Sequence, residues 1–413
     1  MKLVLFLLLA INGPSDKTVY QWRGPDRSGN YPDKNLLKTW PAAGPEELWS
    51  IESIGNGYGS PVFAGDRFYI TGEIDSTCYL FSFNQQGKEQ WRTSMGGEWM
   101  RSCPGSRSAP TVAGELVYAG NGMGNLFCIN RNTGKIIWSK HLAEDFRGVL
   151  PLHGHSESPL IDGNKIFWTA GGKVHNVVAL DRFTGKLVWT NKGFGETSAY
   201  NQPKLIEHPS GHILVTFSAY HMMGFDANTG KMLWSQEQDN YPLEKRGPGY
   251  GDTHCNTVLY ENGTIWYVEG DGNCTVKLEI SADGKSIKEG WRNKDFDSYM
   301  GGVVRIGDYM YCGGTVKPQL ISINAGTGML RDSLRIGTGA IISADGMLYY
   351  YTQKGEMMLL SCNNGNIEKV SSFRISKGTK EHFSHPVINN GVLYIRHGNA
   401  LIAYNIKGNH EGH

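Results

Sequence analysis

A short module recurs along this chain and restricts the folds open to it. In the complete copy, Ser158-Pro159 opens an apolar strand, Ile166-Phe167-Trp168 lies in a second strand, and residues 179–189 read Ala-x-Asp-x-x-Thr-Gly-Lys-x-x-Trp. The same spacing returns at residues 130–138 and 226–234. A unit of a few short strands cannot bury its apolar faces alone. The copies are therefore expected to pack against one another.

Weaker copies extend the series to both ends of the chain. The last copy supplies three strands between Ser384 and Asn405, but the chain ends before a fourth. At the other end, Glu47-Leu48-Trp49-Ser50 looks like a fourth strand without the three before it. An N-terminal strand that completes the last blade would close a ring and remove its free edges.

The length between these ends sets the number of blades. From Trp49 to Asn405 the chain runs for about 356 residues, which at roughly 45 residues per four-stranded blade makes eight. We predict an all-β fold, a single eight-bladed β-propeller, or seven blades if two weak copies merge. Fifty-four glycines and an aromatic content of 11% suit many short strands joined by tight turns.

The motif residues have structural tasks. Gly at the Thr-Gly step accepts the positive φ of a tight turn. The preceding Asp or Asn can cap that turn through backbone amides. The Trp is expected to pack against the neighbouring blade, because a large flat apolar group gains most from burial.

The charge balance excludes one class of partner. The chain has 40 Lys and Arg residues and 39 Asp and Glu residues, so its formal net charge is +1. No net field favours nucleic acid or an anionic membrane surface. We expect no nucleic-acid partner.

The N-terminus indicates export. Lys2 precedes an apolar run from Leu3 to Ile11, which is too short to span a bilayer and reads as a secretory signal. We assign residues 1–14 to a signal peptide, 15–47 to a leader across the propeller, 48–408 to the propeller and 409–413 to a tail. The expected product is a periplasmic or secreted monomer without a transmembrane span.

The module resembles the tryptophan-docking repeat of the pyrroloquinoline-quinone (PQQ) propeller superfamily, which includes quinoprotein alcohol dehydrogenases and the outer-membrane assembly lipoprotein. The leader sequence from Gln21 to Gly29, followed by Trp40-Pro41, looks like the opening of exported PQQ-like repeat proteins. The resemblance implies an eight-bladed ring and an extracytoplasmic address. It does not imply a bound quinone.

Quinoprotein dehydrogenases, as a family, hold PQQ against a vicinal Cys-Cys disulfide. They stack it on a tryptophan and bind Ca²⁺ through carboxylate and amide side chains. No two of the seven cysteines here are adjacent. PQQ with Ca²⁺ is therefore a disfavoured cofactor, and PQQ-dependent oxidation of alcohols or sugars is a minor alternative.

In a propeller, the loops from the outer strand of one blade to the inner strand of the next reach the central funnel. These loops are rich in polar and aromatic residues, and we take them as candidate ligand contacts. The candidates are Tyr58, Trp99, Arg101, Glu157, Asn201, Gln202, Asp252, Tyr299, His382 and His385. Trp99, in an insertion, could be an exposed platform for a sugar ring.

Two chemistries could use this funnel. His153 and His155 would share one face of a strand and could bind a transition metal such as Zn²⁺ or Mn²⁺. Alternatively, Tyr200, Tyr250 or His254 could act as a base while Arg107 neutralises a uronate, as in a polysaccharide lyase.

We favour a module that binds a small molecule, a carbohydrate or a protein partner. The scaffold motif is intact while the quinone signature is missing. A carbohydrate-active enzyme and a quinoprotein dehydrogenase stay open as alternatives.

Overall fold

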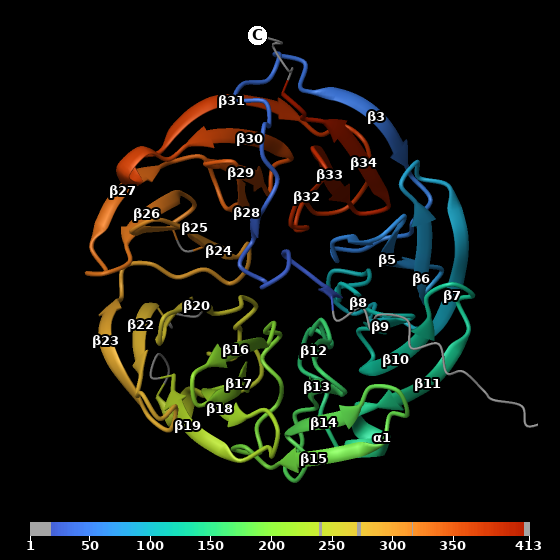
Figure 1. The fold of residues 1–413 in the computed structure, drawn as a ribbon, viewed down its shortest axis with the longest axis vertical. Helices are drawn as coiled ribbons and strands as arrows, with labels where there is room; N and C mark the ends of the chain where they lie inside the picture. The colour runs from blue at the N-terminus through green and yellow to red at the C-terminus, as the bar shows by residue number, and fades with distance from the viewer. Residues whose placement is uncertain (1–17, 239–241, 271–273, 316, 409–413) are drawn as a thin grey trace, which may run out of the picture.

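A computed structural model describes residues 18–238, 242–270, 274–315 and 317–408. Within them the strands form eight sheets, arranged as eight blades around a central axis (Figure 1). The predicted all-β, eight-bladed propeller is confirmed. The proposed signal peptide (residues 1–14) and tail (residues 409–413) lie outside the described residues.

The first four blades follow the chain in order. Blade 1 contains β4 (Val62–Ala64), β5 (Arg67–Ile74), β6 (Thr77–Asn84) and β7 (Glu89–Gly97). Blade 2 contains β8 (Thr111–Ala113), β9 (Leu116–Gly120), β10 (Asn125–Asn130) and β11 (Ile136–His141). Blade 3 contains β12 (Leu160–Asp162), β13 (Lys165–Thr169), β14 (Val177–Asp181) and β15 (Leu187–Asn191). Blade 4 contains β16 (Lys204–His208), β17 (Gly211–Phe217), β18 (His221–Asp226) and β19 (Met232–Glu237).

The second four blades continue the ring. Blade 5 contains β20 (Leu259–Glu261), β21 (Thr264–Val268), β22 (Thr275–Ile280) and β23 (Ile287–Asn293). Blade 6 contains β24 (Val303–Ile306), β25 (Tyr309–Gly313), β26 (Leu320–Asn324) and β27 (Leu330–Leu334). Blade 7 contains β28 (Gly339–Ala344), β29 (Met347–Thr352), β30 (Glu356–Ser361) and β31 (Glu368–Arg374). Blade 8 contains β32 (Val387–Asn389), β33 (Val392–His397), β34 (Ala400–Asn405) and β3 (Glu46–Ile51).

The ring closes through β3, as predicted. This N-terminal strand pairs antiparallel with β34, with Glu46 opposite Asn405 and Ile51 opposite Leu401. The Trp49 ring stacks on Phe68 of blade 1, with centroids 5.8 Å apart. One strand thus joins the last blade to the first.

The motif tryptophans Trp138 and Trp189 pack on the turn of the following blade. Trp138 lies against Gly185, where a Cβ would come within 2.9 Å of its ring, and Gly185 has φ +69°. The Trp138 Nε1 donates to the Arg182 carbonyl at 3.0 Å. Asp181 Oδ1 accepts from the Thr184 amide and hydroxyl, both at 2.8 Å. Any side chain in place of Gly185 would be strained and would displace the indole.

Two short strands of the leader extend the blades toward the axis. The strand β1 (Val19–Tyr20) pairs with β8 of blade 2, and β2 (Asn30–Tyr31) pairs parallel with β28 of blade 7. Between them the leader lies across the centre of the ring (Figure 1). We call this side of the molecule the leader face.

Two buried arginines of the leader hold the blades from within. Arg27 donates to the carbonyls of Ser158, Pro159 and Pro203 at 3.3, 2.6 and 3.0 Å, which joins blades 3 and 4. Arg23 donates to Val303 at 2.7 Å and Ile341 at 2.8 Å, which joins blades 6 and 7. Burial lowers the pKa of Arg27 to about 9 and that of Arg23 to about 10.

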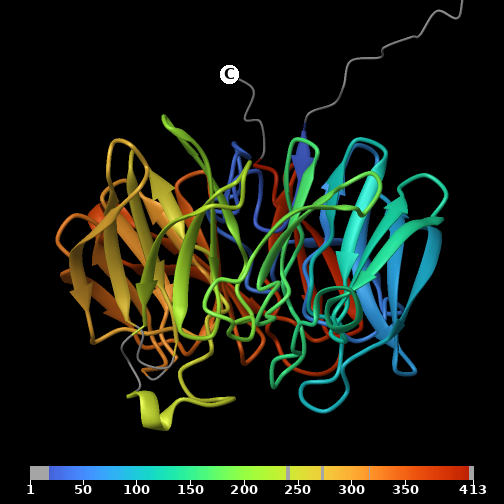
Figure 2. The same cartoon turned by 90° about the horizontal axis from the view of Figure 1, so that it is seen from below.

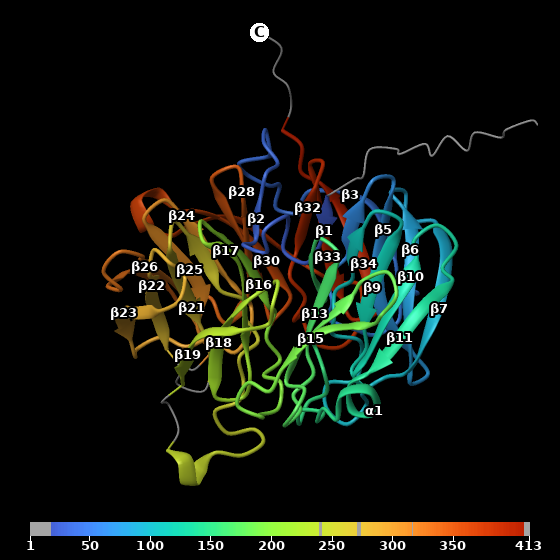
Figure 3. The same cartoon turned by 60° about the horizontal axis from the view of Figure 1, so that its bottom comes forward.

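The opposite side carries the loops between blades, and we call it the funnel face. Figure 2 shows the two faces at the upper and lower edges of the ring. Three helical turns are described: α1 (Leu142–Phe146), η1 (Leu243–Lys245) and η2 (Asn363–Gly365). The helix α1 lies at the lower edge, away from β1 and β2 (Figure 3). None of the described helices has the length and apolar character needed to cross a membrane.

Candidate functional site

A pocket of about 540 Å³ lies on the funnel face where the interblade loops converge. We call it the funnel pocket. Trp22 of the leader contributes to its lining, and its ring meets His385 edge to face with centroids 5.1 Å apart. The other lining residues are Tyr58, Gly59, Ser102, Cys103, Arg107, His153, Ser156, Ser158, Tyr200, Gln202, Gly249, Thr253, Cys255, Tyr299, Met300, Gly301, Thr315, Gln353, Phe383 and His385.

The pocket gathers seven of the residues singled out from the sequence. They come from loops leading into six different blades: Tyr58, Arg107, His153, Tyr200, Gln202, Tyr299 and His385. Because these loops link the outer strand of one blade to the inner strand of the next, they converge where the ring is narrowest. The topology therefore places residues far apart in sequence around one cavity.

One side of the pocket is rich in hydrogen-bond donors. Arg107 donates to the carbonyls of Ser102, Cys103 and Gly105 at 2.5, 3.0 and 2.9 Å. The Tyr200 hydroxyl accepts from the His153 backbone amide at 3.1 Å, and burial raises the pKa of Tyr200 above its ordinary value. Burial thus favours the protonated form of the Tyr200 hydroxyl.

Glu157, predicted as a ligand contact, and His155, predicted as a metal ligand, are buried outside the lining of the pocket. Both carboxylate oxygens of Glu157 accept from the Thr169 amide, at 3.1 and 3.2 Å, and burial raises its pKa to about 7. His155 packs edge to face on Trp168, and burial lowers its pKa to about 4. Both side chains support the inner strands of blade 3.

The structure does not support His153 and His155 as joint ligands on one strand. Residues 151–159 are irregular. The His153 ring lines the pocket, with Nδ1 3.1 Å from the Ser102 hydroxyl, whereas His155 Nε2 lies 3.3 Å from the Thr169 carbonyl. Across the described residues there is no cluster of three or more His, Cys, Asp or Glu that could hold a metal ion.

The proposed lyase residues are not brought together. His254 is fully buried, with Nε2 2.9 Å from the Ala219 carbonyl and its ring stacked on Phe217. Tyr250 is 59% exposed and does not line the pocket. Asp252 is buried and accepts from the Gly249 amide at 3.1 Å. Only Arg107 and Tyr200 of this group face the cavity.

Trp99 is not the exposed platform expected from the sequence. It is 6% exposed, and its Nε1 donates to the Ser102 hydroxyl at 3.2 Å. Arg101 lies over the ring at 5.2 Å and is itself exposed. The insertion folds back, because burying an indole stabilises the loop more than leaving it in water.

The remaining candidates lie outside the lining. The Asn201 amide is buried within 3.1 Å of the Thr216 hydroxyl. The His382 ring contacts the Tyr351 hydroxyl and stacks on His397, with centroids 3.7 Å apart.

Several lining residues escaped the sequence reasoning. Trp22 belongs to the leader, which has no repeat to place it, and Phe383 lies in a predicted funnel loop between His382 and His385. The aromatic residue within an otherwise polar loop was the available signal for Phe383. Met300 likewise follows the predicted Tyr299.

The lining does not fit PQQ with Ca²⁺. Among the described residues that line the funnel pocket there is no Asp or Glu to bind the cation. Cys103 and Cys255 are far apart in sequence, and neither is in a disulfide. The side chains that line the funnel pocket therefore lack the ligands that PQQ with Ca²⁺ requires.

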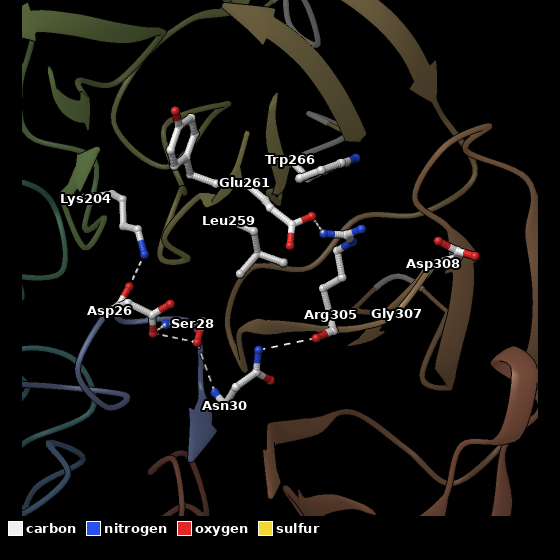
Figure 4. A pocket seen from close by; sticks show the side chains of 11 residues that line it. Asp26, Ser28, Asn30, Lys204, Leu259, Glu261, Trp266, Arg305, Gly307 and Asp308 are labelled. Carbon is white, nitrogen blue, oxygen red and sulfur yellow. Dashed lines mark hydrogen bonds and ion pairs between the residues drawn. The ribbon is translucent and has the colours of Figure 1, made fainter. Parts of the chain in front are cut away.

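A second pocket of about 300 Å³ lies on the leader face. We call it the leader-face pocket (Figure 4). Lys204 donates to the Asp26 carbonyl, and Arg305 pairs with Glu261 while lying 4.7 Å from the Trp266 ring. The Asn30 amide donates to the Arg305 carbonyl at 3.3 Å. Both cationic side chains of this pocket thus have partners within the chain.

Comparisons with known proteins agree with the architecture. A family model described as outer membrane protein assembly factor BamB matches residues 30–148 and 79–331. The outer membrane protein assembly factor BamB of Moranella endobia is 23% identical over 297 residues, 70% of this chain and 72% of that protein.

Quinoproteins are also similar. The 1-butanol dehydrogenase (quinone) of Thauera butanivorans is 29% identical over 163 residues, which cover 35% of this chain and 25% of that enzyme. The match therefore spans a quarter of the enzyme's length. The quinohemoprotein alcohol dehydrogenase ADHIIG from Pseudomonas putida HK5 superposes with a TM-score of 0.66 at 12% identity, covering 96% of this chain and 81% of that one.

The fold and the repeats define a PQQ-like β-propeller related to BamB and to the quinoprotein dehydrogenases. More particularly, the chain belongs to the family described as outer membrane protein assembly factor BamB, whose model matches well over half of it.

Proposed function

We propose that this protein is a non-catalytic binding propeller, and that its funnel pocket receives an apolar group of a ligand or protein partner. The observation that carries the proposal is the pocket itself, with Trp22, Tyr58, Tyr200, Tyr299 and Phe383 around one cavity. Flat apolar surfaces of this kind favour binding through burial.

The surroundings of the pocket support binding over catalysis. The candidate base His254 and the carboxylate of Glu157 are both buried and hydrogen-bonded to backbone groups. Tyr200 holds its proton at neutral pH. Catalysis of proton transfer needs a group whose pKa lies near the working pH and that reaches the substrate.

A neutral fluorescent probe tests the pocket. We expect N-phenyl-1-naphthylamine to bind the full chain saturably at one site. Met300→Trp fills the cavity and should weaken binding at least about tenfold, since it removes the buried contacts. Met329→Trp is the matched control, because Met329 is 69% exposed and away from the pocket. Equal binding by both variants, or no saturable binding, would refute the proposal.

We further propose that the protein acts outside the cytoplasm. The apolar run from Leu3 to Ile11 supports export. In a Gram-negative host, the tagged full chain should fractionate with the periplasm, and a Leu7→Arg/Leu8→Arg variant should stay in the cytoplasm. Cytoplasmic localisation of the unaltered chain would exclude export.

A further inference from the structure

The charges around the funnel pocket are unbalanced. Among the described residues that line it, Arg107 is the one Lys or Arg and no carboxylate accompanies it. The described part of the chain gives Arg107 no ion pair; its guanidinium contacts three neutral carbonyls. Glu98, which acts on Arg107 through space, is buried, and burial raises its pKa.

Arg107 has donor capacity left over. A guanidinium carries five N–H bonds, and three of them point to the carbonyls of its own loop. The Nε hydrogen and one Nη1 hydrogen have no acceptor in the described residues. Burial lowers the pKa of Arg107, which an anion in the pocket would offset.

Tyr200 adds a donor beside Arg107. Its hydroxyl oxygen accepts from the His153 amide, and no described group accepts the hydroxyl proton. Arg107 and Tyr200 both line the funnel pocket. By contrast, the Tyr58 hydroxyl already donates to Glu381 at 2.6 Å. One side of the pocket therefore offers donors without acceptors.

The lining also contains apolar side chains. Trp22, Met300 and Phe383 line the cavity, and Phe383 packs on Tyr58 with centroids 5.5 Å apart. His385 is also present, but burial holds its pKa well below the ordinary value, so it adds no positive charge. A ligand that fits both parts has a flat apolar body and an anionic end.

We propose that the funnel pocket selects an apolar carboxylate, with the carboxylate at Arg107 and Tyr200 and the body among the aromatic residues. This rests on the proposed binding function and names its ligand class. The carboxylate would accept two N–H bonds of Arg107 and the Tyr200 O–H. Charge-assisted bonds of this kind are stronger than neutral ones.

Four probes separate charge from body. We expect 2-naphthoate to bind the full chain about tenfold or more tightly than 2-naphthamide, the gain typical of a charge-assisted pair. 2-Naphthylmethylammonium should bind more weakly than the amide, because Arg107 repels it. Glucuronate, which has the carboxylate without an apolar body, should also bind weakly. If 2-naphthamide binds as tightly as 2-naphthoate, the selectivity is refuted while the binding function stands.

Variants locate the selectivity. Arg107→Gln should abolish the preference for 2-naphthoate over 2-naphthamide, whereas Arg101→Gln, at an exposed neighbouring arginine, should keep that preference. Because Arg107 also holds its loop, Tyr200→Phe provides an independent check. This change removes one donor and should lower 2-naphthoate affinity several-fold, more than it lowers 2-naphthamide affinity, because the bond to a charged acceptor is the stronger one. A preference that survives both variants would overturn the assignment.

Two sources of such a carboxylate are distinguished by peptides. A peptide ending in phenylalanine is compared as its free acid and as its C-terminal amide. Preference for the acid identifies the end of a protein chain as a ligand. If free 2-naphthoate binds but neither peptide does, the pocket takes a small molecule. If N-phenyl-1-naphthylamine and every naphthyl probe fail to bind, the binding function itself is refuted.

Discussion

The funnel pocket and the leader-face pocket are lined by different chemical groups. On the leader face, Arg305 pairs with Glu261 and Lys204 donates to the Asp26 backbone carbonyl, so both cationic side chains have partners within the chain. On the funnel face, Arg107 and Tyr200 point donors at a cavity with no carboxylate in its described lining. A polar cavity alone is therefore a poor sign of a ligand site. Polar side chains that have no hydrogen-bond partner within the protein are a better indication of a ligand site.

The leader contributes residues to both pockets. Arg27 and Arg23 donate to carbonyls of the blades, and Trp22, next to Arg23, lines the funnel pocket. The same short segment thus supplies Asp26 to one pocket and Trp22 to the other. Substitutions in the leader should therefore affect both pockets, while substitutions in the interblade loops should affect the funnel pocket alone.

Arg27→Met should produce the largest effect. The substitution keeps an unbranched apolar stem but leaves the carbonyls of Ser158 and Pro203 without their donor, while the Pro159 carbonyl keeps a hydrogen bond from the Thr111 hydroxyl. Because each buried carbonyl left unpaired costs about 1–3 kcal/mol, we expect a loss of roughly 3–5 kcal/mol in the free energy of unfolding. Chemical denaturation measures it. Arg335→Met, at an exposed arginine, is the control; an equal change in both variants would mean that Arg27 does not hold the blades.

Glu157 should make stability depend on pH. Burial raises its pKa from 4.5 to about 7, so the folded protein binds a proton that the unfolded chain has released. This stabilisation is complete below pH 4.5 and is lost as the pH rises through 7. Relative to Glu157→Gln, the native protein should lose up to about 3 kcal/mol across that range.

Denaturation curves of both proteins at several pH values between 4 and 8 test this expectation. The difference between the two free energies is the relevant quantity, since it cancels the other titrating groups. A difference that does not change with pH would show that folding does not shift the pKa of Glu157.

The smallest effect is expected on the leader face. Glu261→Gln removes the carboxylate that pairs with Arg305, but the Glu261 side chain is 55% exposed. Pairs of this kind contribute about 0–1 kcal/mol and are screened by salt. A double-mutant cycle with Arg305→Met measures the coupling. A coupling free energy well above 1 kcal/mol would contradict the view that the leader-face pocket is an ordinary solvated surface.

The repeats made the ring predictable. Residues 130–138, 179–189 and 226–234 each encode a turn and a docking tryptophan locally, so their spacing translates directly into blades. The closing strand was also predictable, because the last copy lacks a fourth strand and Glu47–Ser50 supplies one. The structure assigns it to Glu46–Ile51.

The funnel residues were predictable as a set but not individually. Tyr200 and His254 both lie in interblade loops, yet Tyr200 lines the pocket and His254 packs on Phe217. Irregular loops have no periodicity to indicate which side chain points inward. Trp99 was misplaced for the same reason.

The sequence by itself determined the all-β ring, its number of blades and its closure, because those features arise from local turns and repeated packing between neighbours. Only the tertiary structure decided that Arg23 and Arg27 donate to carbonyls of the blades. It also decided that Trp22, Arg107 and Tyr200 line one pocket. Those contacts join segments up to hundreds of residues apart. Only the closed ring brings them within hydrogen-bonding distance.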